Sequence, residues 1–256
     1  EVLALTKAYE ELNGTKVDFD PNDAKAAHLF LRNLPKGFFS ECSIYVTLEP
    51  CSHQGKTPSC ASLLKILSLK EVIIGTKDPI EGHDNGAVGL NNVTLGILEE
   101  KCKNLLEPFL IWQKRAFILF KLAQTTNARI GGGYLSSQSS LEHVHQIRAV
   151  CDTLLIGGNT VRTDRPRLDC RFTGEKAPDV IIYTQDQQLD KEIPLFKVDN
   201  REVRLTDKLN FLDKPSLILV EGGEGMLRAL KEKIDWLLFY QTPKLTTNNL
   251  TYNTTM

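Results

Sequence analysis

Two cysteines with a short loop between them are the side chains in this sequence best suited to metal chemistry. The segment reads Pro50-Cys51-Ser52-His53-Gln54-Gly55-Lys56-Thr57-Pro58-Ser59-Cys60, with Cys51 after a predicted strand and Cys60 at the start of a predicted helix. Free backbone N–H groups at a helix start favour a thiolate, and thiolates bind Zn²⁺ readily. Two cysteines cannot complete a tetrahedral site, and His53 lies within the loop itself. The spacing therefore leaves a zinc site and two packed cysteines as equal alternatives.

Glycines follow two predicted strands in the second half of the chain, at Gly157-Gly158 and at Gly222-Gly223-Glu224-Gly225. Without a Cβ, the backbone amides at such positions can approach a phosphate closely. Neither segment matches G-x-G-x-x-G inside a βαβ unit, so an ordinary Rossmann dinucleotide site is not supported. Arginine suits phosphate binding because its planar fork matches the phosphate oxygens, although Arg171 by itself could be an ordinary surface charge.

Hydrophobic patterning divides the chain into two α/β series. A strand, a helix and a second strand between residues 43 and 75 form a βαβ unit, which implies a parallel pair of strands. The continuous apolar run from residue 117 to 123 is expected for a strand covered on both faces. We place the boundary at residue 113, giving domains 1–113 and 114–256. Predicted helices cover residues 2–12, 24–34, 60–69, 99–113, 141–150 and 226–233, and predicted strands cover 43–48, 71–75, 93–97, 117–123, 153–158, 180–183, 216–220 and 236–240.

Three polar features receive ordinary interpretations from the sequence. His143 and His145 lie two positions apart on a predicted helix, so they face different sides and are expected to be surface residues rather than a metal pair. Asp164 is, from its neighbours alone, a turn former. The polar end of the chain after Leu245 is predicted to be a loop.

Composition excludes several classes of protein. The chain has 256 residues, and 31 Lys and Arg against 32 Asp and Glu give a net charge of −1, which argues against nucleic-acid binding through bulk positive charge. No apolar run approaches the ~18 residues of a membrane span. Six cysteines in a chain of this length do not make a disulfide scaffold. We expect a cytoplasmic protein with neither a nucleic-acid nor a membrane partner.

The first half resembles the zinc nucleobase deaminases, which carry His-x-Glu at a helix start, Pro-Cys at a strand end and a second cysteine further on. Its Thr47-Leu48-Glu49-Pro50-Cys51 segment, followed by Ser-His-x-Gly-x-Thr-Pro, is similar to the bifunctional deaminase/reductase family of riboflavin biosynthesis. The resemblance implies that Cys51 and Cys60 are zinc ligands and that Glu1 is the catalytic proton shuttle. The third ligand, a His two positions before Glu1, would then lie upstream of this sequence, and we expect such upstream residues to exist.

The second half resembles the dihydrofolate-reductase-like domain of the same family. The matching segments occur in order: Phe120-Lys121-Leu122-Ala123, Asn127-Ala128-Arg129-Ile130, the stretch from Thr160 through Leu168 with Arg171, Val220-Glu221-Gly222-Gly223, and Pro243-Lys244-Leu245. The resemblance thus implies a cytidine-deaminase-like αβα domain followed by a dihydrofolate-reductase-like α/β domain. Tyr134 and Gly132 stand where the family usually has Trp and Ser.

Roles for individual residues follow from this resemblance alone. The NADPH-binding set would be Ala123, Tyr134, Thr160, Asp164 and Gly223, and the substrate-binding set Gly132, Arg148, Leu168, Arg171 and Glu221. The enzyme would deaminate a phosphorylated ribosylaminopyrimidine and then reduce its ribosyl group to ribityl, using Zn²⁺ and NADPH, as a homodimer or higher oligomer. Two alternatives remain, a reductase whose deaminase-like domain is degenerate and a reductase whose first half serves oligomer contacts. The residues before Glu1 and the metal content separate them.

Overall fold

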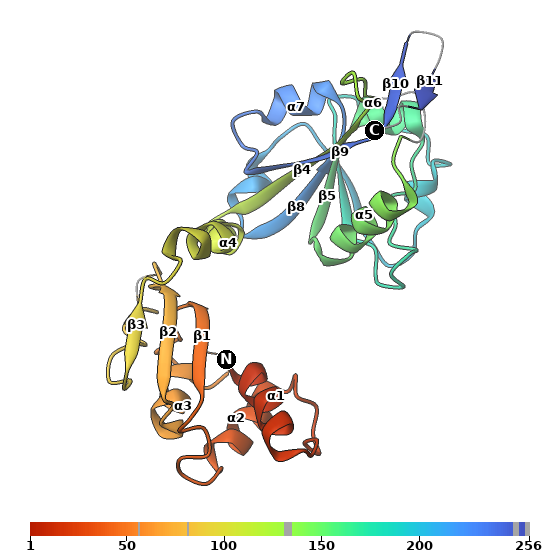
Figure 1. Ribbon diagram of the computed structural model, residues 1–256. Coiled ribbons are helices and arrows are strands. Elements are labelled where there is room, and N and C mark those ends of the chain that lie inside the picture. Colours follow the sequence, from red (N-terminus) through yellow and green to blue (C-terminus); the bar gives the residue numbers. More distant parts are fainter. Residues whose placement is uncertain (56, 81, 131–134, 248–250, 254–256) are drawn as a thin grey trace. The chain divides into compact units, whose positions relative to one another are not determined.

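The computed structural model describes residues 1–55, 57–80, 82–130, 135–247 and 251–253 (Figure 1). The chain forms two compact units, Glu1–Glu107 and Pro108–Met256. The division falls inside helix α4 (Glu99–Trp112), which carries no buried residue and contains Pro108. Each unit has its own hydrophobic core and is described by itself.

The first unit is a three-stranded parallel sheet packed with helices. Strands β1 (Ser43–Leu48), β2 (Glu71–Thr76) and β3 (Val93–Leu95) lie in that order, and Tyr45 pairs with Ile73 in parallel register. Helix α3 (Cys60–Leu67) connects β1 to β2, so the predicted βαβ unit is confirmed. The Cys51 loop joins the carboxyl end of β1 to this crossover helix, so it lies at the carboxyl edge of the sheet. The core of this unit combines residues of α1, α2, α3, β1 and β2.

Cap residues set the end of one further helix of the first unit and the start of another. Helix α1 (Val2–Asn13) is closed by Gly14, which takes the left-handed conformation at φ 70°. Helix α2 (Ala24–Arg32) starts after Asp23, whose carboxylate accepts hydrogen bonds from the Lys25 and Ala26 amides. The side chains of Leu5 and Leu31 from these helices are buried against the sheet.

The second unit is built on a six-stranded parallel sheet. The strand order is β7-β6-β5-β8-β4-β9, and every neighbouring pair is parallel. The strands are β4 (Ala116–Gln124), β5 (Thr153–Gly157), β6 (Asp179–Tyr183), β7 (Val203–Thr206), β8 (Ser216–Glu221) and β9 (Trp236–Gln241). The helices are α5 (Gln138–Val150), α6 (Gly158–Asp164) and α7 (Glu224–Leu230), with 3-10 turns at Pro194–Lys197 and Asn210–Asp213.

Side-chain alternation along the central strands assigns one face of this sheet to α7 and the other to α5 (Figure 1). Ile118, Phe120 and Leu122 of β4 pack in the cluster that contains Met226 of α7. The alternate residues, including Lys121, point to the opposite face, where α5 lies. The run 117–123 is therefore a covered strand as predicted, with one charged residue facing α5.

The polar end of the chain contains strand structure, so the prediction of a loop after Leu245 was wrong. Strands β10 (Lys244–Thr246) and β11 (Thr251–Asn253) pair in antiparallel register, with Leu245 opposite Tyr252. Threonine and tyrosine favour strands even in a polar segment. A hairpin therefore needs no apolar alternation to form here.

The order of the large sheet reverses between β5 and β8, and the crevice of such a sheet lies outside the carboxyl ends of these two strands. Strand β5 continues to β6 on one side of it, whereas β8 continues to β4 and β9 on the other. In open parallel sheets, ligands bind at such a reversal of strand order. Residues Gly157-Gly158 and Glu221-Gly222-Gly223 leave the sheet at this point.

Among the helices of the described part of the chain, none is long and apolar enough to cross a membrane.

Candidate functional site

The cysteine pair of the first unit is brought together at the start of α3. The Cys60 amide donates to the Cys51 sulfur at 3.3 Å, and the Ser59 hydroxyl donates to the Cys51 carbonyl at 2.8 Å. The hydrogen bond from the Cys60 side chain lowers the pKa of Cys51 to about 6 against the opposing effect of burial. The pKa of Cys60 is raised, first by that bond and by burial, then by the nearby Glu1 carboxylate. Glu1, Cys51 and Cys60 are therefore neighbours, as the resemblance implies.

The loops around this pair are held by a buried glutamate. Glu49 is 5% exposed, and its carboxylate accepts from the Ala87 amide at 2.9 Å and from the Asp78 amide at 3.3 Å. A Cβ on Gly86 would lie 1.6 Å from the Pro50 carbonyl oxygen. The loop that follows β2 is thus locked against the Pro50-Cys51 segment by residues that spacing alone did not single out.

Zinc fits the thiols of this site but not a complete ligand set. A catalytic zinc needs three protein ligands and an open position. Within the residues that the structure describes, no group of three or more His, Cys, Asp or Glu side chains is placed to hold a metal ion. Cys51 and Cys60 would supply two of the ligands that a zinc ion needs.

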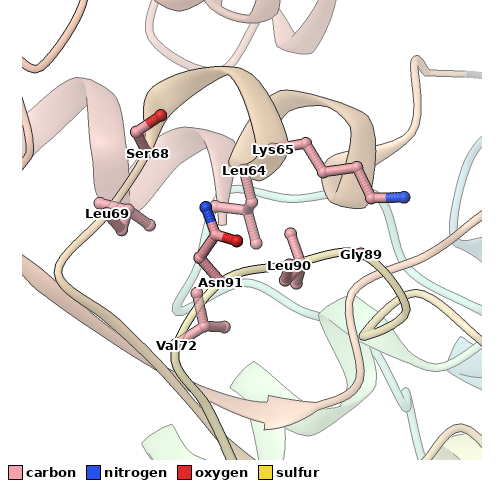
Figure 2. A pocket seen from close by; sticks show the side chains of 8 residues that line it. All are labelled: Leu64, Lys65, Ser68, Leu69, Val72, Gly89, Leu90 and Asn91. Atoms are coloured by element: carbon pink, nitrogen blue, oxygen red, sulfur yellow. The ribbon is translucent and has the colours of Figure 1, made fainter.

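A small pocket of the first unit lies apart from the cysteines (Figure 2). Figure 2 shows the side chains of Leu64, Val72 and Leu90 converging between the end of α3 and the loop before β3. Lys65 is the charged residue among those that line it, the others being Ser68, Leu69, Gly89 and Asn91. The lining offers no acid, thiol or imidazole, and none of the predicted site residues belongs to it.

At the centre of the second unit, Arg148 of α5 holds Glu221 at the end of β8. Arg148 Nε lies 2.6 Å from Glu221 Oε1 and Nη2 lies 2.9 Å from Oε2, a two-point ion pair with both side chains 11% exposed. Burial alone would raise the pKa of Glu221, but the charge and hydrogen bonds of Arg148 outweigh it and the net shift is downward. A charged carboxylate is thereby fixed at the crevice.

Strand β4 supplies a lysine to the same row of residues. Lys121 pairs with Glu221 in the β4–β8 register, and its ammonium lies 3.8 Å from Glu221 Oε2. The ammonium also lies 5.8 Å from the ring centroid of Tyr240, which pairs with Ala123 in the β4–β9 register. The Tyr240 hydroxyl is 2.9 Å from His143 Nδ1 on α5. These contacts join α5 and three neighbouring strands around one polar patch.

The loop after α6 adds arginines to this patch. The buried Asp169 carboxylate accepts from Arg167 Nε at 2.6 Å and from Arg171 Nη1 at 3.3 Å. Leu168 is buried with a φ of 57°, a conformation that is rare for a leucine. Arg201 stabilises this backbone by donating to the carbonyls of Arg167 and Leu168. Arg167 and Arg171 keep about half of their side-chain surface exposed.

His145 lies beneath this cluster, so its prediction as a surface residue was wrong. It is 2% exposed, and its ring centroid lies 4.4 Å from that of Phe172. Burial, and then the charge of Arg148, lowers the pKa of His145. Helix α5 packs over charged residues and so buries a polar side chain. The apolar periodicity of a sequence does not reveal burial of this kind. His143, two positions earlier, is exposed as predicted.

The glycines at the crevice differ in the space around them. A Cβ on Gly158 would lie 2.6 Å from the Thr184 side chain, and one on Gly222 would lie 2.8 Å from Met226 Cγ. At Gly223 and Gly225 no atom lies within 4 Å of that position. Gly223 caps α7 without a side-chain hydrogen bond to its first amides. Gly158 and Gly222 serve internal packing, whereas Gly223 and Gly225 have open space at their Cβ positions.

Comparisons with known proteins agree with this geometry. The model of the RibD C-terminal domain matches residues 121–249, about half of the chain. The riboflavin biosynthesis protein RibD of Actinobacillus pleuropneumoniae is 34% identical over 255 residues, which cover 80% of this chain and 68% of that protein. This chain belongs to the RibD family. The RibD of Synechocystis is 34% identical over 170 residues, covering 61% of this chain and 46% of that protein, so the chain spans about half its length.

A solved RibD-type structure supports the same assignment. The Thermotoga maritima diaminohydroxyphosphoribosylaminopyrimidine deaminase/5-amino-6-(5-phosphoribosylamino)uracil reductase is 26% identical, with a TM-score of 0.65 over 81% of this chain and 69% of that one. Residues 121–249 start at Lys121 and include the Arg148–Glu221 pair, so the polar patch lies within the RibD C-terminal domain. The fold is α/β with parallel sheets, as expected.

Four of the residues assigned to the RibD domain by resemblance lie together. Arg148, Leu168, Arg171 and Glu221 lie in one cluster, linked through the hydrogen bond from Arg148 Nη1 to the Asp169 carbonyl at 3.2 Å. Thr160 lies on α6 near Gly157, and its hydroxyl is 3.9 Å from the position that a Cβ on that glycine would take. Gly223 has open space at its Cβ position, and Asp164 is exposed at the end of α6. Gly132 and Tyr134 lie outside the described residues.

Several site residues were missed by the sequence analysis. Lys121, Asp169, Arg167 and Arg201 form ion pairs or backbone contacts with the predicted residues. Asp169 and Arg167 adjoin Leu168 in the chain, so their position was an available signal. No local signal pointed to Arg201, because these contacts join segments more than thirty positions apart.

Proposed function

We propose that the second unit is an NADPH-dependent reductase of riboflavin biosynthesis that converts the ribosyl group of a phosphorylated ribosylaminopyrimidine to ribityl. The observation that carries this proposal is the Arg148–Glu221 ion pair at the reversal of strand order, next to the open glycines of α7. The ion pair offers fixed charges for a sugar phosphate, and the open glycines leave room for a second phosphate group.

The residues present fit a dinucleotide. Open space beside Gly223 and Gly225 lets the backbone approach a pyrophosphate closely. A second glycine, Gly157, directly precedes α6. We infer that Thr160, Ala123 and Asp164 line the rest of the nucleotide path, as the resemblance implies. NADPH, when bound, supplies a hydride for the sugar carbon.

The remaining work belongs to this chain's own side chains. Glu221, kept ionised by Arg148 and Lys121, orients the hydroxyl groups of the sugar. The exposed parts of Arg167 and Arg171 hold the 5′-phosphate, since both guanidinium groups are fixed by Asp169 yet keep free donors. Binding at two points would fix the sugar carbon in position for a hydride from bound NADPH.

The test is direct reduction by the purified chain. It is incubated with NADPH and 5-amino-6-(5-phosphoribosylamino)uracil, with loss of NADPH absorbance and gain of two hydrogens in the product as readouts. Arg171→Ala should raise KM for the phosphorylated substrate by about tenfold, corresponding to ~1.4 kcal/mol of lost binding. Arg204→Ala, at an exposed position of β7, is the matched control. Absence of NADPH oxidation by the wild-type chain contradicts the proposal, and an unchanged KM removes Arg171 from the phosphate site.

For the first unit we propose a zinc-dependent pyrimidine deaminase. The supporting observation is that Glu1 adjoins two cysteines whose thiols share a hydrogen bond at the start of α3. Cys51 and Cys60 would hold the metal, and Glu1 would carry protons between the attacking water and the leaving amine. The competing function, a reductase with a degenerate first domain, predicts that the natural protein binds no zinc through Cys51.

Zinc content separates these two functions. We expect the natural protein to lose its zinc on Cys51→Ser and to keep it on Cys42→Ser, a matched control outside the pair. A His two positions before Glu1 in the natural sequence would complete the ligand set. Equal zinc in both variants, or deamination by Glu1→Gln at the wild-type rate, would contradict the deaminase assignment.

A further inference from the structure

We propose that the Tyr240 hydroxyl is the proton donor of the reduction and that His143 connects it to solvent. This inference rests on the proposed reductase function and adds the group that supplies the proton. Hydride transfer accounts for two electrons and one hydrogen, but opening the sugar ring consumes a proton as well. The residues assigned by resemblance leave the donor of that proton unnamed.

Tyr240 lies at the right place for this role. It sits at the carboxyl end of β9, beside Ala123 of β4 and on the same sheet face as Lys121 and Glu221. The Lys121 ammonium lies 5.8 Å from its ring centroid and 3.8 Å from the Glu221 carboxylate. A sugar held by Glu221 would therefore have the Tyr240 ring as a neighbour.

His143 gives Tyr240 a route to water. Its Nδ1 is 2.9 Å from the Tyr240 oxygen, and the imidazole is exposed on α5. When Nδ1 carries the proton, it donates to the phenol oxygen, which leaves the phenol O–H free to point toward the crevice. The exposed ring then recovers its own proton from solvent.

The chemistry balances with these two residues and NADPH. A hydride adds to C1′ of the ribosyl group as the C1′–O4′ bond breaks. The bonding pair stays on O4′, which takes the proton from Tyr240 and becomes the 4′-hydroxyl of the ribityl chain. NADPH is oxidised to NADP⁺. The tyrosinate takes a proton from His143 Nδ1 while the exposed Nε2 takes one from solvent, so the imidazole stays neutral.

The other polar groups of the patch are less suited to donate. Glu221 is held ionised by Arg148, and Arg148 is committed to Glu221 by two hydrogen bonds. If Lys121 gave up its proton, Glu221 would lose part of its charge compensation in a partly buried site. Burial and the charge of Glu221 raise the pKa of Tyr240, so the phenol keeps its proton at neutral pH until the reaction requires it.

Removal of the hydroxyl is the first test. Tyr240→Phe should lower kcat by about 100-fold or more, the usual contribution of a positioned acid, with KM for both substrates within about twofold of wild type. Tyr45→Phe, which removes an exposed hydroxyl from β1, is the matched control and should retain wild-type kinetics. A Tyr240→Phe variant whose kcat stays near wild type overturns the inference.

The relay is tested separately at His143. His143→Ala should lower kcat, and added imidazole should restore part of it because the site is open to solvent; a purely structural hydrogen bond would not be rescued in this way. Nuclear magnetic resonance adds a readout that needs no turnover, since the ring resonances of His143 should change in Tyr240→Phe, which removes the hydroxyl that lies 2.9 Å from Nδ1. Absence of both effects contradicts the relay.

The proposed reductase function and the proposed proton donor fail differently. If the wild type and Tyr45→Phe do not oxidise NADPH with the phosphorylated substrate, the reductase function itself is wrong. If both are active and Tyr240→Phe is equally active, the reductase function stands and only the proton donor is wrong. Unchanged NADPH affinity and circular dichroism for Tyr240→Phe establish that the variant is folded.

Discussion

Arg148 and Glu221 form a two-point ion pair across 73 positions of sequence, with hydrogen bonds of 2.6 and 2.9 Å. A third donor of the same guanidinium, Nη1, reaches the Asp169 carbonyl at 3.2 Å. One side chain of α5 therefore ties the end of β8 to the loop that carries Arg167 and Arg171. In this structure Arg148 supports Glu221, whereas Arg167 and Arg171, the proposed phosphate ligands, keep about half of their side-chain surface exposed.

Truncation of Arg148 should be costly for folding. Arg148→Ala leaves the Glu221 carboxylate buried without its main partner, and removing one member of a buried pair costs about 3–5 kcal/mol. Arg165→Ala is the matched control, because its ion pair with Asp190 leaves both side chains 48% exposed, and such surface pairs contribute about 0–1 kcal/mol. Urea denaturation of both variants measures the free energies of unfolding; similar losses would contradict the structural role of Arg148.

The same pair should make stability depend on acidity. The folded-state pKa of Glu221 lies below its ordinary value. The ion pair therefore contributes its full stability at pH values above the unfolded-state pKa of about 4.3. That contribution is lost as the pH falls through the folded-state pKa. Between about pH 6 and pH 3, wild type should therefore lose more stability than Glu221→Gln. Glu175→Gln, at an exposed loop position, should follow the wild type. Parallel pH profiles for all three proteins would refute this assignment.

Local patterns sufficed for the long elements of the fold. The apolar strands around Ile118, Leu155 and Ile218 and the βαβ unit of the first half were predicted because burial on both faces gives continuous apolar runs. Helix α6 and strand β7, with seven and four residues, were missed. Elements of that length contain too few periods of an apolar pattern to stand out from a loop.

The contacts of the site were harder to predict than its members. The resemblance identified Arg148 and Glu221 one by one, but their pairing depends on the position of α5 over β8, which no local signal encodes. The burial of His145 and Asp169 escaped prediction for the same reason, since it comes from the charged groups that surround them. Gly222 and Gly223 look alike in sequence, and only the position of Met226 distinguishes them.

These two glycines should respond differently to a methyl group. Gly223→Ala meets open space at an ordinary φ of −99°, so the fold should lose no more than about 1 kcal/mol, the usual cost of alanine at a helix cap. Its methyl group would enter the space proposed for the cofactor phosphates and should raise KM for NADPH by about tenfold, or ~1.4 kcal/mol.

Gly222→Ala provides the contrast. Its Cβ would lie 2.8 Å from Met226 Cγ, so the thermal midpoint should fall, with a loss of about 1–3 kcal/mol from overpacking. Thermal unfolding and NADPH titration of both variants measure the two effects. Equal losses of stability, or an unchanged KM for Gly223→Ala, would contradict this division of roles.

Gly86 should be the least replaceable glycine of the first unit. A Cβ there would lie 1.6 Å from the Pro50 carbonyl oxygen, a backbone atom that cannot rotate away. Gly86→Ala must therefore separate this loop from the Cys51 segment. The separation would break the hydrogen bonds that the Glu49 carboxylate accepts from the Ala87 and Asp78 amides. We expect a loss of about 1–3 kcal/mol or more, together with faster tryptic cleavage at Lys77. Gly55→Ala, in the neighbouring loop, meets the His53 ring at an ordinary 3.6 Å and should leave both measurements near wild type. If Gly86→Ala is as stable and as resistant to trypsin as Gly55→Ala, the close approach of the two loops is not needed for the fold of this unit.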